Sequence, residues 1–175
     1  IGGLTTALAL ARAGHDVHVF EAVQDIQPLG VGINLLPHAA RILRELGVLD
    51  ELLGRGIATR ELAYFNRHGQ KIWTEPRGLF AGFDAPQISI SRGALQEALL
   101  EHARLKLGDD RIITGQRLIS FRTDSDQAIA CFQSPAGDRL EAASDTLICV
   151  DGIHSAGRRQ MYPDEGVPVY SGRLL

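Results

Sequence analysis

The residues that could do chemistry in this chain are glycines and acids in three stretches. The first stretch, "IGGLTTALALARAGHDVHVFEA", carries small residues such as Gly3 and Ala7 at the spacing of a dinucleotide fingerprint, and Glu21 ends the expected strand. A helix N-terminus there can receive a pyrophosphate, and a carboxylate at Glu21 can accept hydrogen bonds from both ribose hydroxyls. The alternative is that Gly3 and Ala7 only pack the helix on the strand and Glu21 is a solvated strand end.

Only the third fingerprint glycine, Gly3, lies in the chain, so we expect the preceding strand and two further glycines to lie ahead of Ile1. A second stretch, "PLGVGINLLP", places Gly30 and Gly32 where the chain passes from the second expected strand into a helix. Glycines there either form a plain turn or let the backbone approach a flat ligand closely. Both interpretations stay open from the sequence.

The third stretch, "CVDGIHSAGRR", follows the apolar run "DTLICV". That run predicts a buried parallel strand, which would bring Asp151 and the amides after it to the same sheet edge as the first helix. Asp151, His154 and Ser155 do not form a hydrolase triad, because three residues on one turn cannot converge as nucleophile, base and orienting group. The alternative is an ordinary Asp-Gly turn.

Composition argues against several other classes of protein. A net charge of −3 with scattered basic residues gives no footprint for nucleic acid, and no apolar run approaches the ~20 residues of a membrane span. His15 and His18 have no third ligand nearby, so we expect no metal site. Cys131 and Cys149 lie in apolar runs and are predicted to be reduced and buried, which favours the cytoplasm.

The periodicity of apolar residues predicts an α/β organisation, with Gly14 ending the first helix and Pro37 and Gly47 bounding the second. Around "NRHG" the pattern alternates and predicts a hairpin. In chain order the predicted elements are a helix at 4–13, a strand at 16–21, a helix at 36–47, a hairpin at 61–75, a strand end and helix at 89–108, an antiparallel meander at 118–121, 128–132 and 139–142, and a buried strand at 145–150.

With these stretches in place, the sequence resembles the FAD-dependent aromatic monooxygenases of the para-hydroxybenzoate hydroxylase type. The opening stretch is similar to that family's dinucleotide helix and ribose acid, and "GVGINLLPHAARILRELGVLDEL" resembles its flavin-side loop and helix. "ISRGALQEALL" resembles a helix that begins with an arginine reaching FAD, and "CVDGIHSAGRR" resembles its Asp-Gly fingerprint. "PLGVGIN", "ELAYFNRHGQKIWTEPRG" and "SISRGALQ" look closest to bacterial phenazine hydroxylases within the family.

The resemblance implies an incomplete, Rossmann-like FAD-binding domain interleaved with part of an α+β substrate domain. The FAD-binding parts would be residues 1–57 and 88–165, the substrate-domain segment 58–87, and the start of a substrate-domain strand 166–175. The family's third fingerprint, a Gly-Asp pair, is absent from the 175 residues, so we expect an internal fragment of a longer enzyme that is inactive alone. Where the family commonly has Gly-Ala before the fingerprint aspartate, this chain has Cys149 and Val150. Gly157 replaces an apolar branched residue, which leaves the packing under the turn open.

The implied reaction is hydroxylation of an aromatic or heteroaromatic substrate with O₂. NADH or NADPH would reduce FAD, and the reduced flavin would form a C4a-hydroperoxide. No side chain is expected to act as a catalytic group. The resemblance implies cofactor contacts at Gly2, Gly3, Glu21, Gly32, Ile33, Arg92, Leu118, Asp151 and Gly152. Two alternatives remain, a nicotinamide-dependent dehydrogenase and a non-catalytic, truncated FAD-binding module.

Overall fold

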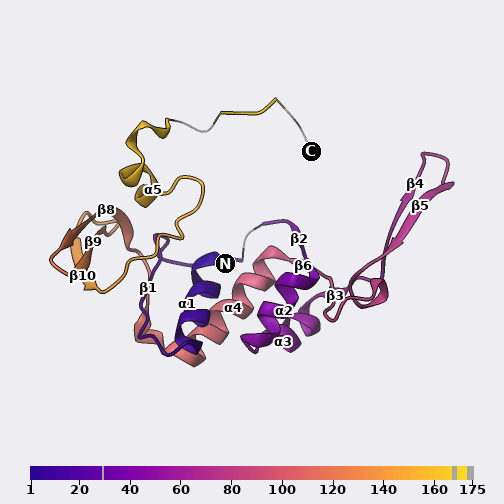
Figure 1. The fold of residues 1–175 in the computed structure, drawn as a ribbon, viewed down its shortest axis with the longest axis horizontal. Helices are drawn as coiled ribbons and strands as arrows, with labels where there is room; N and C mark the ends of the chain where they lie inside the picture. Colours follow the sequence, from indigo (N-terminus) through magenta and orange to yellow (C-terminus); the bar gives the residue numbers. More distant parts are fainter. Residues whose placement is uncertain (29, 167–168, 173–175) are drawn as a thin grey trace. The chain divides into compact units, whose positions relative to one another are not determined.

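The computed structural model describes residues 1–28, 30–166 and 169–172 (Figure 1). The chain divides into two compact units. The helical unit comprises Ile1–Val19 and Ile26–Ile112, and the meander unit comprises Phe20–Asp25 and Ile113–Leu175.

The helical unit contains four α-helices among its described residues, and sequence signals explain where the first two of them begin or end. Gly14 (φ +90°) and Gly47 (φ +80°) take the left-handed conformation just beyond the first and second helices, and Pro37 opens the second. These features confirm the predicted helices. The helices are α1 (Gly2–Arg12), α2 (Pro37–Glu45), α3 (Leu49–Arg55) and α4 (Arg92–Leu107).

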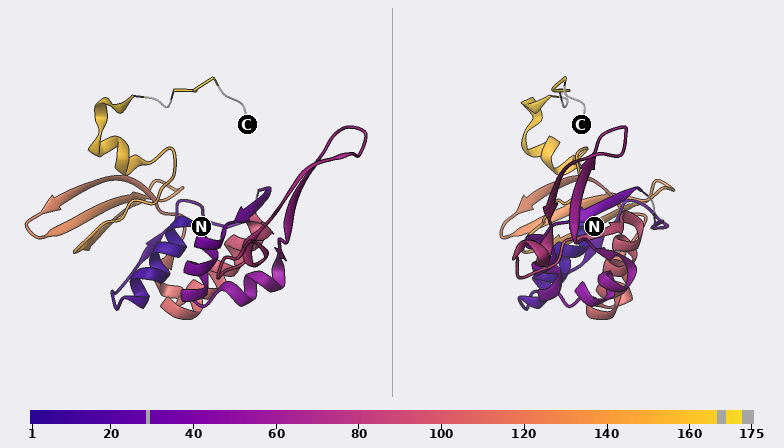
Figure 2. Two further views of the ribbon diagram at one scale, coloured as in Figure 1. Left: turned by 45° about the vertical axis from the view of Figure 1, so that its right-hand side comes forward. Right: turned by 90° about the vertical axis from the view of Figure 1, so that its right-hand side faces the viewer.

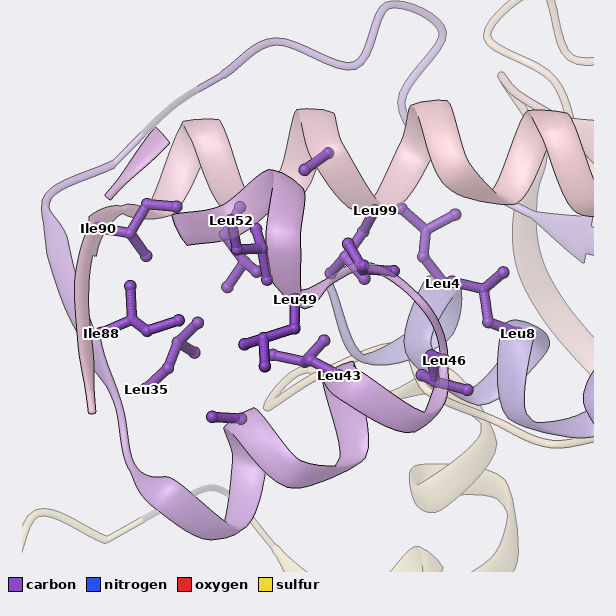
Figure 3. Close-up of a cluster of buried hydrophobic side chains, with 14 of the residues drawn as sticks. Leu4, Leu8, Leu35, Leu43, Leu46, Leu49, Leu52, Ile88, Ile90 and Leu99 are labelled. Atoms are coloured by element: carbon purple, nitrogen blue, oxygen red, sulfur yellow. The ribbon is translucent and has the colours of Figure 1, made fainter. Parts of the chain in front are cut away.

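The core of the helical unit lies among these helices and one small sheet (Figure 3). Its largest fully buried side chains are Val48, Leu52, Ile88, Leu95 and Leu99. Each such side chain contributes about 1.5–3 kcal/mol by leaving water. This apolar packing is what holds the N-termini of α1 and α4 in place.

The sheet of the helical unit has the antiparallel order β2 (Gly32–Leu35), β6 (Ile88–Ser91) and β3 (Ile57–Ala58). Gly32 pairs with Ser91 and Asn34 pairs with Ser89. Leu35, Ile88 and Ile90 are buried in the core, so the residues that alternate with them face the opposite side. The sheet therefore has one buried, apolar face and one exposed face, called the polar face, which carries Asn34, Ser89 and Ser91 beside the exposed Ile57.

The predicted hairpin is confirmed as β4 (Glu61–Phe65) and β5 (Lys71–Pro76), which reach away from the helices (Figure 2). Its turn is held by Asn66, whose Oδ1 accepts from the backbone N–H groups of His68 and Gln70 at 2.9 and 3.0 Å. A 3₁₀ turn, η1 (Gly78–Ala81), follows.

The meander unit confirms the predicted antiparallel meander, in the order β10 (Arg139–Ser144), β9 (Gln127–Gln133) and β8 (Arg117–Asp124). Phe20 stacks on Phe132 with ring centroids 4.2 Å apart, and the side-chain amide of Gln160 in α5 (Ala156–Met161) forms hydrogen bonds with the backbone of Phe121. Two-residue strands β1 (Val19–Phe20) and β7 (Ile112–Ile113) pair where the chain passes between the units. The remaining elements are η2 (Asp109–Arg111) and η3 (Pro163–Glu165).

The predicted buried strand at 145–150 is wrong. None of these residues is in a strand, and Ile148 is 49% exposed. A strand requires a hydrogen-bonded neighbour, and within the described ranges no strand pairs with this run. The strand predicted at 16–21 shortens to β1 for the same reason.

The two cysteines and two of the expected segments agree only in part with the expectations from the sequence. Cys131 and Cys149 are free as predicted, but both are half-buried, not buried. The predicted segment 58–87 lies within the helical unit, and the division into cofactor and substrate domains stays a prediction. The strand predicted at 166–175 falls partly outside the described residues, and 169–172 form no regular element. No helix in the described part of the chain is long and apolar enough to span a membrane.

Candidate cofactor-binding site

The predicted cofactor contacts divide between the two units. The helical unit holds five of them, Gly2, Gly3, Gly32, Ile33 and Arg92. The meander unit holds the other four, Glu21, Leu118, Asp151 and Gly152.

The start of α1 has features of a helix end that attracts anions. No side chain caps it, and no acidic residue lies in its first turn. A Cβ added at Gly3 would meet nothing within 4 Å, whereas Leu4, Ala7 and Leu8 are buried and fix the helix in the unit. The first N–H groups of a helix and its dipole attract anions, so this end can receive a phosphate group.

The N-terminus of α4 has the same character. Ser91 stands at the N-cap, but its hydroxyl makes no capping hydrogen bond. Arg92 is the first helical residue, and its side chain forms no ion pair within residues 1–28, 30–166 and 169–172. A cation at this end opposes the helix dipole, so Arg92 is best explained by an anionic partner.

Close packing positions the start of α4. A Cβ at Gly93 would lie 2.8 Å from the carbonyl carbon and Cβ of Pro28, so this glycine is required by the fold. Gly30 has φ +120° and lies against the aliphatic stem of Arg92, with 3.3 Å between an added Cβ and Cδ. The loop before β2 thus supports the arginine through its stem.

Gly32 lies in strand β2, so the plain-turn interpretation is wrong for this residue. Its φ is not in the left-handed region, and an added Cβ would meet only the Ile90 carbonyl oxygen, at 3.9 Å. Ile33 is half-buried against the core. An open cavity of about 530 Å³ lies over this part of the sheet, lined among others by Gly32, Ile33 and Ser91.

In the meander unit, the backbone of Glu21 is held on both sides. Its N–H donates to the Ile113 carbonyl at 2.9 Å, and its carbonyl accepts from Gln116 N–H at 2.8 Å. Carboxylate oxygen Oε1 accepts from Val23 N–H at 2.9 Å, which leaves Oε2 without a protein partner in the described ranges. Leu118 pairs across the sheet with Phe132 and is half-buried.

The Asp-Gly turn is shaped by its own aspartate. Asp151 Oδ2 accepts from the backbone N–H groups of Ala156 and Gly157, at 2.7 and 3.3 Å. Partial burial raises the pKa of Asp151, but hydrogen bonds from the Ser155 side chain and from these backbone groups outweigh it and hold the pKa below its ordinary value. Gly152 takes φ +79°, and its carbonyl accepts from Ser155 N–H at 3.1 Å.

The same turn exposes backbone donors. The N–H groups of Gly152, Ile153 and His154 have no acceptor within the described part of the chain, and all three residues are exposed. The carboxylate of Asp151 accepts hydrogen bonds within the turn, so it holds these backbone donors in place. A ligand at this turn would therefore be contacted by backbone N–H groups.

A compensating pair, which the sequence interpretation missed, lies beneath the turn. A Cβ at Gly157 would lie 2.3 Å from Cys149 Sγ and 2.8 Å from its Cβ. Cys149 therefore fills the space that a side chain at position 157 would take. Burial, and then the charge of Asp151, raise the pKa of this thiol. The sequence did contain a signal for this pair. Relative to the family pattern, residue 149 is larger, cysteine in place of glycine, and residue 157 is smaller, glycine in place of a branched apolar residue.

These surroundings fit FAD. The pyrophosphate needs helix N-termini and a free cation, the ribose needs a carboxylate acceptor, and the flat ring needs backbone that it can approach closely. The ends of α1 and α4, Arg92, Glu21 Oε2 and the open glycine Gly32 provide each of these chemical groups. Within the described ranges, no group of three or more His, Cys, Asp or Glu side chains could hold a metal.

The chain has an α/β fold, and comparison with known proteins identifies it as Rossmann-like and FAD-binding. The FAD binding domain model matches residues 1–167. Phenazine 1,6-dicarboxylic acid hydroxylase PhzS of Lysobacter antibioticus is 45% identical over 168 residues, covering 94% of this chain and 41% of that protein. The FAD-dependent urate hydroxylase of Klebsiella pneumoniae is 32% identical over 160 residues, covering 90% of this chain and 40% of that protein.

A solved structure gives the same result for the fold. The crystal structure of Klebsiella pneumoniae HpxO complexed with FAD and uric acid has a TM-score of 0.75 and 28% identity, covering 91% of this chain and 39% of that one. The chain belongs to the FAD-binding domain family. It spans about two fifths of the length of these relatives.

Proposed function

We propose that the complete protein carrying this chain is an FAD-dependent aromatic monooxygenase that uses NADH or NADPH and O₂. The observation that carries the proposal is Gly32, a glycine in a strand that the fold does not require. Glycine in a strand costs roughly 0.5–1 kcal/mol relative to alanine. Such a cost is explained if the backbone at Gly32 must come close to the flavin ring.

The remaining predicted residues take roles around this contact. Gly2, Gly3 and Arg92 would bind the pyrophosphate at the two helix ends, and Glu21 would accept from the ribose. Ile33 would lie beside the ring with Gly32. The backbone donors around Asp151 and Gly152, and the side chain of Leu118, would complete the contacts on the meander unit.

Bound FAD would supply the redox chemistry, passing electrons from NAD(P)H to O₂. The reaction balances as NAD(P)H, H⁺, O₂ and the aromatic substrate giving NAD(P)⁺, water and the hydroxylated product. The protein's part is to bind, orient and exclude water, so no side chain is assigned as nucleophile or metal ligand. We also propose a cytoplasmic location, because the free thiols of Cys131 and Cys149 suit a reducing compartment.

The test is a purification of the complete protein. We expect a yellow protein with bound FAD, NAD(P)H oxidation that rises when phenazine-1,6-dicarboxylic acid is added, and a product heavier by one oxygen atom, which mass spectrometry with ¹⁸O₂ would trace to O₂. A colourless protein that binds NAD(P)H would favour the dehydrogenase. A protein that binds FAD but never oxidises NAD(P)H would favour the non-catalytic module.

A further inference from the structure

The polar face of the sheet β2-β6-β3 carries side chains that the proposed cofactor contacts do not use. Gly32 and Asn34 lie on this face of β2, Ser89 and Ser91 on this face of β6, and Thr59 just beyond β3. Asn34 and Ser89 line the same 530 Å³ cavity as Gly32. The core face of these strands is apolar, so the polar residues do not contribute to the core.

Three of these side chains form a chain of hydrogen bonds across the sheet. Thr59 Oγ1 lies 2.7 Å from Ser89 Oγ, and Ser89 Oγ donates to Asn34 Oδ1 at 2.6 Å. Since the hydroxyl hydrogen of Ser89 is used on Asn34, Thr59 must donate to Ser89. In the structure this chain holds Oδ1 of Asn34 toward Ser89 and leaves Nδ2 on the other side of the amide.

In this orientation the Asn34 Nδ2 group is available as a donor, while Oδ1 already accepts one hydrogen bond from Ser89. Nδ2 has no partner within residues 1–28, 30–166 and 169–172. The side chain belongs to an exposed residue beside the cavity. An NH₂ group held in this way selects ligands that carry a hydrogen-bond acceptor.

No free charge competes with this donor at the cavity. The charged residue among those that line it, Arg55, is bound by Glu51 and Glu101 at 2.6 Å each, with Glu97 at 3.7 Å. Recognition at this wall would therefore depend on a neutral amide donor, which binds a carboxylate or a carbonyl oxygen without a counter-charge.

The distance along the strand places this donor beside the reacting ring. Gly32 and Asn34 are two residues apart on one face, which is about 7 Å, close to the width of an aromatic ring. If the flavin ring lies against Gly32, as the proposed function has it, a substrate that reacts with it must lie within about one ring of that point. Asn34 is then within reach of a substituent on the substrate.

We propose that Asn34 is a specificity-determining residue that donates a hydrogen bond to an acceptor oxygen, carboxylate or carbonyl, on the aromatic substrate. Ser89 and Thr59 are positioning residues that hold the amide with Nδ2 toward the cavity. The proposal rests on the proposed function and specifies its substrate class, an aromatic ring with an oxygen acceptor substituent.

The test compares phenazine-1,6-dicarboxylic acid with unsubstituted phenazine as probes of the complete, FAD-loaded protein. Dissociation constants are read from the change in the flavin absorption spectrum. Wild type should bind the diacid more tightly than phenazine. Asn34→Asp keeps the size but loses the donor and adds repulsion, so it should weaken diacid binding by about tenfold or more and leave phenazine nearly unchanged.

Three further variants separate recognition from general damage. Ser89→Ala should lower the preference for the diacid through KM and not through kcat, and Ser89→Thr, which keeps the hydroxyl, should restore it. Asn66→Asp makes the same change in the hairpin turn, where it loses the bond to Gln70 Oε1, and should leave the preference unaltered because Asn66 does not line the cavity. A wild type without a preference for the diacid, or an Asn34→Asp protein that keeps it, would overturn the proposal. Failure to bind FAD at all would instead contradict the proposed function.

Discussion

Gly32 in β2 and Gly157 in α5 are both glycines inside regular elements, yet their surroundings differ. At Gly157 the space of a side chain is filled by Cys149, 2.3 Å from where a Cβ would stand. At Gly32 the nearest atom is the Ile90 carbonyl oxygen at 3.9 Å, and a cavity lies beside it. Neither position has the left-handed φ that would by itself require glycine.

The difference separates two reasons for keeping a glycine. Gly157 is explained by the protein, because its neighbour Cys149 needs the room. Gly32 is not explained by any protein atom, although glycine weakens a strand. The conclusion that a ligand comes close to Gly32 depends on this contrast, and substitution of either glycine by alanine tests one side of it.

Gly157→Ala should have the largest effect on stability. Its Cβ would overlap Cys149, and overpacking typically costs about 1–3 kcal/mol, which outweighs the gain of up to about 1 kcal/mol in helix propensity. We expect a lower urea midpoint for the apoprotein. In a Cys149→Gly background the same substitution should be tolerated, so the two changes should couple strongly. Equal destabilisation in both backgrounds would mean that Cys149 does not occupy this space.

Asp151→Asn should have a smaller, pH-dependent effect. Because the pKa of Asp151 is lowered in the folded protein, its ionised form stabilises the turn above the unfolded pKa of about 3.9, and this contribution is lost as pH falls through the folded pKa. At pH 7 the variant should melt below wild type, and the gap should close below about pH 4. Melting temperatures measured from pH 7 to 3 would show this, whereas a gap that widens in acid would assign the turn's stability to other groups.

The fold elements differ in how well the sequence alone predicts them. Periodicity predicted α1, α2, α4, the hairpin and the meander, because each is determined by local spacing and by glycine or proline at its ends. It failed at 145–150, where six apolar-rich residues look like a strand but find no neighbour to pair with. Pairing is a property of other segments and is not encoded in the run itself.

The residues of the candidate site were likewise predicted only in part. The sequence pointed to Gly32 and Arg92, but it did not separate a turn glycine from a strand glycine, or a paired arginine from an unpaired one. The Cys149–Gly157 pair and the hydrogen-bond chain from Thr59 to Asn34 both join positions brought together only by folding. Contacts of this kind have no fixed spacing in the sequence.

The central claim is tested most directly by FAD titration of Gly32→Ala apoprotein, followed by flavin fluorescence. The fold has room for the methyl group, so apoprotein stability should stay equal or rise by up to about 1 kcal/mol, while FAD affinity should fall by about tenfold or more. Gly54→Ala is the matched control, since Gly54 is also open, in α3, and should gain stability with FAD affinity unchanged. Wild-type FAD affinity in Gly32→Ala would contradict the claim that the ligand lies against this strand.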